Sequence, residues 1–144
     1  MNNVIRSFGL QSNEALVAKK SLTFDGTAGK GATGTITLFT VTGTVAMICF
    51  GVGTVNLVSA GGGTLALGVA ASAATFVASQ TATALTAGLL LAGAPAAVAN
   101  YLTTKLVNSS NVIATVSTAA ITGGAVDFYC LWRPISDGAT VIAA

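Results

Sequence analysis

The chain contains few side chains that could act as acids, bases, nucleophiles or metal ligands. It has no histidine, and its carboxylates are scattered along the 144 residues at Glu14, Asp25, Asp127 and Asp137. No two of them have a spacing typical of a general acid and base, and a zinc site would need more His or Cys ligands. We therefore predict that the protein is not an enzyme and that it binds no metal and no cofactor.

Two local patterns resemble functional motifs but have simpler interpretations. Asp25 and Asp137 each precede a glycine, which is typical of turns rather than of calcium loops. Lys30 follows a glycine-rich segment, residues 26–29, that resembles a phosphate loop. The Gly-x4-Gly-Lys-Ser/Thr spacing is missing there, and a Thr-rich strand follows in place of a helix. We interpret both segments as loops without a ligand.

The two cysteines, Cys49 and Cys130, lie inside apolar runs and have no histidine that could activate them. Residues 1–8 lack the continuous apolar region of a secretory signal. Because disulfides are typical of exported proteins, we predict two buried free thiols, with a disulfide as the weaker alternative.

Charged residues make up only 7% of the chain, whereas hydrophobic residues make up 53%. The formal net charge of +2 is too small to indicate nucleic-acid binding. A protein with so little charge tends to associate, so the composition predicts an assembly rather than an isolated monomer.

Residues 31–104 contain no Asp, Glu, Lys or Arg, which raises the question of a membrane protein. Residues 44–60 and 82–99 approach the minimum length of a transmembrane helix. Asn56 interrupts the first segment and Pro95 the second, and neither has Trp or Tyr at its ends. We predict no membrane contact, and keep a small membrane protein as an alternative.

Residues 31–104 also have the residue pattern of short β-strands. Residues 35–42 alternate Thr with apolar residues, apart from a slip at Leu38 and Phe39 that can be a bulge. Pro134 should end a strand, because proline cannot donate to a central ladder. The pattern predicts strands at residues 21–24, 35–42, 45–52, 55–58, 64–69, 74–78, 89–91, 101–106, 112–116, 126–132 and 141–142.

These strands predict an all-β fold, a single-domain β-sandwich or jelly-roll-like domain. We place the domain at residues 21–144, behind an extended N-terminal arm at residues 1–20. In the segment 126–134, aromatic and basic side chains are concentrated at Phe128, Tyr129, Trp132 and Arg133. We expect them in the core or, alternatively, at a subunit interface, where Tyr, Trp and Arg are enriched.

Two segments resemble small virion proteins of tailed phages, of the head decoration (cement) type. They are residues 21–26 leading into 34–43, and residues 127–134. The resemblance implies a β-rich homotrimer that binds the major capsid protein on the outer surface of the capsid, after synthesis in the host cytoplasm. It also implies that the arm contacts the capsid, through Arg6, Phe8, Leu10, Lys19 and Lys20. A tail-fibre or baseplate module for host attachment is the alternative.

Overall fold

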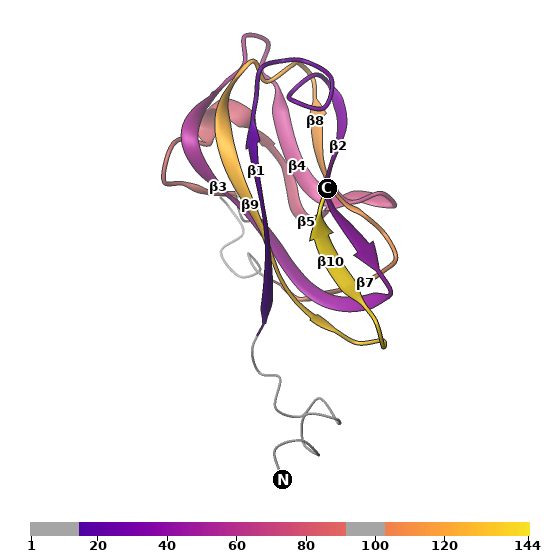
Figure 1. Cartoon of the computed structure of the whole chain (residues 1–144). Coiled ribbons are helices and arrows are strands. Elements are labelled where there is room, and N and C mark those ends of the chain that lie inside the picture. Colours follow the sequence, from indigo (N-terminus) through magenta and orange to yellow (C-terminus); the bar gives the residue numbers. More distant parts are fainter. Residues whose placement is uncertain (1–14, 92–102) are drawn as a thin grey trace.

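The computed structural model describes residues 15–91 and 103–144. They form two five-stranded antiparallel sheets that pack face to face (Figure 1). The first sheet has the order β1 (Leu16–Thr23), β9 (Gly123–Pro134), β3 (Thr44–Val58) and β6 (Leu90–Leu91), and β7 (Lys105–Asn108) also pairs with β3. The second has the order β10 (Thr140–Ala143), β2 (Gly34–Thr42), β8 (Val112–Ser117), β4 (Thr64–Val69) and β5 (Ser72–Thr81). The predicted all-β sandwich is confirmed, with one short 3-10 helix, η1 (Ala82–Ala84).

Alternation of side chains builds the core between the sheets. On β2, Ile36 and Val41 are buried, while the threonines beside them are exposed. The predicted slip in this pattern is confirmed as a bulge, because the register with β8 shifts between Thr37 and Phe39. The bulge lets Leu38 and Phe39, which are neighbours in sequence, both point into the core with no exposed surface.

Strand β3 is one strand of 15 residues, whereas the sequence predicted two separate strands over this range. Gly53 lies inside β3, at a register shift. Its missing side chain leaves room for a neighbouring loop, since a Cβ there would lie 2.3 Å from the carbonyl oxygen of Thr86. Glycine in this strand therefore marks a close approach of two backbones rather than a turn.

Strand β1 begins at Leu16, so the predicted boundary of the arm at residue 20 is wrong. Residues 16–23 pair with the long strand β9, from Leu16 opposite Trp132 to Thr23 opposite Ala125. Lys20 belongs to the sandwich, where its ammonium donates to the carbonyl oxygens of Thr37 and Ala144 and links β1 to the second sheet. The arm residues Arg6, Phe8 and Leu10 lie outside the described residues.

The first candidate transmembrane segment, residues 44–60, contains strand β3. Part of the second, and the start of the strand predicted at 101–106, lie outside the described residues, and β7 begins at Lys105. Within residues 15–91 and 103–144, no helix has the length and apolarity needed to cross a membrane.

Gly31 provides a test of how tightly the β1–β2 loop packs. It has φ +120°, and an added Cβ would lie 2.1 Å from the carbonyl oxygen of Ile121. We expect Gly31→Ala to lower the free energy of unfolding by about 3 kcal/mol, because both its φ and the close contact disfavour a side chain. Gly29→Ala is the matched control, since Gly29 also has positive φ but open space around it.

Chemical denaturation of both variants measures the difference. The control should lose about 1 kcal/mol, the cost of a left-handed backbone alone. Equal losses for the two variants would show that the contact with Ile121 contributes nothing.

Candidate interaction surface

The outer side of the first sheet is unusually apolar. In an antiparallel pair, residues directly opposite each other share a face, and β3 and β9 point Cys49, Cys130 and Phe128 into the core. The alternate positions therefore point outward. We call the following set the outer apolar face: Val17, Ala46, Ile48, Phe50, Val52, Leu90, Leu106, Tyr129 and Leu131.

The outer apolar face is continuous across strands. Val17 on β1 lies opposite Leu131 on β9, which in turn lies opposite Ile48 on β3. The next row along the strands joins Tyr129 to Phe50, whose rings stack with centroids 5.5 Å apart. Side chains from five strands, β1, β9, β3, β6 and β7, thus meet in one surface rather than occurring singly.

Several members of this face are well exposed. Val17 is 62% exposed, Leu90 51% and Leu106 73%. Single exposed apolar residues are normal on proteins, but contiguous groups mark interaction sites. The outer apolar face is therefore the candidate functional site of this protein.

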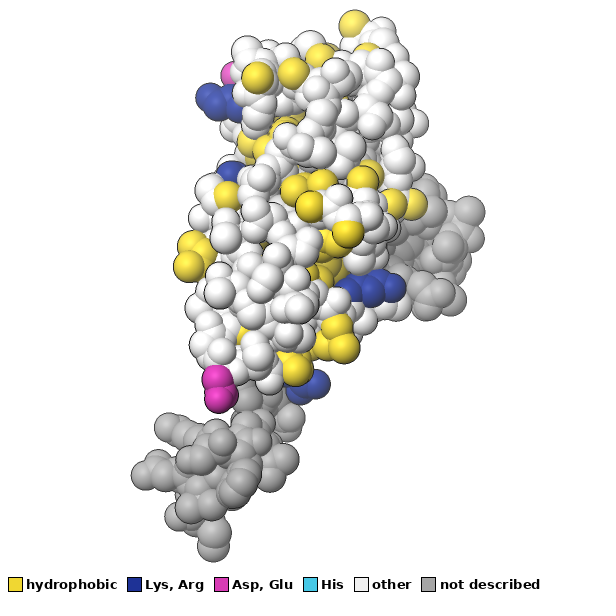
Figure 2. All heavy atoms as spheres, turned by 90° about the vertical axis from the view of Figure 1, so that its right-hand side faces the viewer, with side chains coloured by type: hydrophobic (Ala, Val, Ile, Leu, Met, Phe, Trp, Pro, Cys, Tyr) yellow, Lys and Arg dark blue, Asp and Glu magenta, His cyan; other side chains and the backbone are white. Residues whose placement is uncertain are grey.

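The outer side of the second sheet is different. Strand β2 presents exposed threonines there, at positions 35, 37, 40 and 42. Figure 2 views the molecule from the side on which β2 and β10 lie in Figure 1, and white atoms, which are polar side chains and backbone, predominate there. The apolar side chain of Ile142 on β10, which is on this side, lies opposite a threonine of β2, so it is not joined into apolar rows like those on the first sheet.

A small polar cluster lies on the outer apolar face. The Lys19 ammonium is 2.7 Å from an oxygen of Asp127, and the Ser21 hydroxyl donates to the other oxygen. Lys19 also lies 5.5 Å from the centre of the Tyr129 ring, within the range of a cation–π contact. The two charges on the face therefore neutralise each other.

The pair changes the titration of both groups. The hydrogen bond from Lys19, followed by that from Ser21, lowers the pKa of Asp127 below its usual range, and the bond to Asp127 raises the pKa of Lys19. A carboxyl group with a lowered pKa stabilises the fold fully above its unfolded pKa, and this contribution is lost as the pH falls through the folded value.

We therefore expect the melting temperature to fall in acid, and Asp127→Asn to flatten that fall below about pH 4. Asp25 is the internal comparison, because hydrogen bonds from the Thr27 hydroxyl and backbone N–H lower its pKa in an exposed loop. Melting curves of wild type, Asp127→Asn and Asp25→Asn between pH 7 and pH 2 measure the effect. An acid dependence of Asp127→Asn identical to that of wild type would contradict it.

A shallow cavity of about 210 Å³ lies at one end of the outer apolar face. Its lining includes Ala46 and Ile48 from β3 and Leu131 and Arg133 from β9. Arg133 is exposed and brings a guanidinium group to the border of the face. The cavity thus forms a depression at the end of the outer apolar face, and Arg133 gives this end a polar border.

The four predicted residues of β9 separate into two groups. Phe128 and Trp132 point into the core, whereas Tyr129 and Arg133 occupy outward positions. The core position predicted for these residues thus applies to Phe128 and Trp132, and the predicted subunit-interface role of Tyr129 and Arg133 stays a prediction. The sequence missed Val17, Ile48, Phe50, Leu90 and Leu106, because only the strand order places them beside Tyr129.

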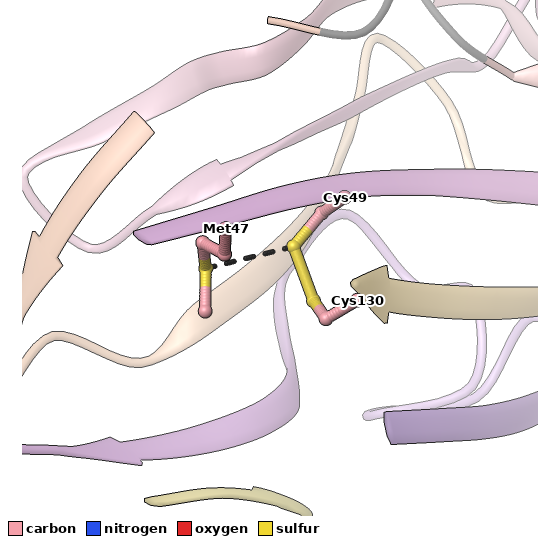
Figure 3. The surroundings of a disulfide bond; sticks show 3 residues. All are labelled: Met47, Cys49 and Cys130. Carbon is pink, nitrogen blue, oxygen red and sulfur yellow. Dashed lines mark hydrogen bonds between the residues drawn. A yellow bond between two sulfur atoms is a disulfide. The ribbon is translucent and has the colours of Figure 1, made fainter. Parts of the chain in front are cut away.

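The predicted free thiols are wrong, because Cys49 and Cys130 form a disulfide (Figure 3). They lie directly opposite each other on β3 and β9, with a Cα–Cα distance of 4.4 Å. This matches a non-hydrogen-bonded pair of antiparallel strands, where the side chains approach most closely. Met47 Sδ contacts Cys49 Sγ at 3.7 Å, so the bond is enclosed by the core.

Among residues 15–91 and 103–144, no three side chains of His, Cys, Asp or Glu are grouped so that they could hold a metal ion. Comparisons with protein families, with curated proteins and with solved structures found no match.

Proposed function

We propose that this protein is a structural subunit of a virion, a decoration or cement protein that binds the shell of major capsid protein as an oligomer. The observation that supports a structural role is the outer apolar face, which joins side chains of five strands and leaves Val17, Leu90 and Leu106 exposed. Such a surface is typical of a subunit that is buried against other proteins in an assembly. The resemblance of residues 21–26, 34–43 and 127–134 to phage virion proteins supports an assembly on a capsid.

The physical basis of the role is binding linked to assembly. A subunit that binds only the assembled shell stabilises that shell by mass action. A symmetric homo-oligomer fits this role, because it repeats one contact at equivalent positions. The arm before Leu16 provides a further contact to the shell in this proposal, through Arg6, Phe8 and Leu10.

The disulfide also supports this location. Disulfides persist on virion surfaces and in other oxidising surroundings, and are rare in the cytosol. A protein made in the host cytoplasm and carried out on the capsid would meet oxidising conditions after release. Cys49 and Cys130 are buried, which protects the bond once it has formed.

Purified virions test the proposal. We expect the protein at high copy number per particle, as density on the outside of the head in a cryo-electron microscopy map. Purified protein should also co-sediment with shells that lack it. Absence from the head would refute the proposal, and a few copies confined to the tail would indicate the host-attachment alternative.

A further inference from the structure

We infer that the outer apolar face is the surface through which copies of this chain bind one another. The inference rests on the oligomeric structural role proposed above and identifies the contact that forms the oligomer. The occupant of the face is thus a second copy of the chain rather than the capsid protein.

The size of the face suits a subunit interface. From Ala46 to Val52 it extends about 20 Å along the strands, and four strands give about 19 Å across them. The projected area is therefore about 400 Å², and the accessible area is larger, because side chains project from the sheet. A stable interface buries about 800 Å² per partner. The face thus supplies the apolar centre of such an interface, with Arg133 and Ser21 in its polar rim.

The charge of the face favours an identical partner over an acidic or basic one. Lys19 and Asp127 neutralise each other within one chain, so the interior of the face presents no charge that would select a partner of the opposite sign, and Arg133 adds a positive charge only at its border. Two copies that meet through the neutral interior of the face do so without repulsion there. The whole chain, with a net charge of +2, adds little repulsion at a distance.

The shape of the face also favours a second copy of the chain as its partner. Sheets pack on sheets at about 10 Å with interdigitating side chains, and the two sheets of this protein already pack in that way. Every copy carries the same rows, in which Phe50 stacks on Tyr129 and Ile48 lies opposite Leu131. Aromatic side chains in the centre of a patch are typical of residues that dominate binding energy.

The test is the double variant Val17→Glu with Leu106→Glu in the full chain. Both side chains are largely exposed in the subunit, so the fold should tolerate the change, while carboxylates facing other copies should weaken association at least 100-fold. The matched control is Thr37→Glu with Thr40→Glu, which adds the same charges to the outer side of the second sheet.

Sedimentation equilibrium measures the oligomeric state, with circular dichroism and melting temperature to verify folding. We expect wild type and control to be oligomers and the Val17→Glu, Leu106→Glu variant to be a folded monomer. A wild-type chain that stays monomeric at millimolar concentration overturns the inference, and so does a double variant that remains fully oligomeric.

Co-sedimentation of the same samples with shells separates this inference from the proposed function. If the double variant remains oligomeric but no longer binds shells, the face contacts the capsid protein: the inference fails and the proposed function stands. If the wild type associates through the face but binds no shell, the inference stands and the proposed function fails.

Discussion

Replacing Cys49 and Cys130 together by alanine is expected to lower the free energy of unfolding by about 4 kcal/mol. The disulfide joins residues that are 81 apart in sequence, so it restricts a long loop of the unfolded chain. It also joins β3 to β9, the two strands that form the middle of the first sheet. Loss of the bond therefore affects both the unfolded ensemble and the centre of the fold.

Denaturant titration of the wild type with and without reductant measures the same quantity without mutation. The reduced protein should unfold at a lower denaturant concentration, close to that of the double alanine variant. Thiol titration of unfolded, unreduced protein should find no free thiol. Two reactive thiols in that experiment would contradict the disulfide, and the alanine variant would then report only lost packing.

Phe128→Ala is expected to lower the free energy of unfolding by about 4 kcal/mol. Phe128 has no exposed surface and lies opposite Gly51 on β3. A Cβ at Gly51 would lie 3.3 Å from two carbons of the Phe128 ring, so the ring lies over the space that the glycine leaves. Truncation would leave a cavity that neighbouring side chains can fill only partly.

Tyr129→Ala is the matched control for this prediction. Tyr129 is the next residue of the same strand, but its side chain lies on the outer apolar face against Phe50. Its loss should cost the subunit about 1 kcal/mol, the order of an aromatic pair, and should weaken association between copies. Thermal and chemical denaturation compare the two variants. Equal destabilisation would contradict the assignment of these neighbours to opposite sides of the sheet.

Much of the secondary structure could be predicted from the sequence. Alternation of Thr with apolar residues predicted β2 and its bulge at Leu38 and Phe39, and Pro134 predicted the end of β9. Strand β4 matches its predicted range, 64–69. These features depend on side-chain direction and on backbone hydrogen bonding of adjacent residues, so they are local. The start of β1 was missed, because residues 16–20 become a strand only by pairing with β9.

The candidate site was predictable only in part. Tyr129 and Arg133 were predicted as core or subunit-interface residues and Lys19 as a capsid contact. The sequence did not show that Leu106 and Val17, far apart in the chain, lie on the same surface. The low charge of the chain predicted that some surface is covered, without indicating which one. Strand order decided this, by placing the apolar alternate positions of β1, β9, β3 and β7 side by side.

The sequence by itself determined that this chain folds into β-strands with little surface charge. Only the tertiary structure decided that Cys49 meets Cys130, and that apolar side chains of several strands join on the outer side of the first sheet, whereas β2 presents threonines on the outer side of the second. The physical reason is that periodicity specifies two faces for each strand, whereas pairing and register between distant strands decide which faces combine.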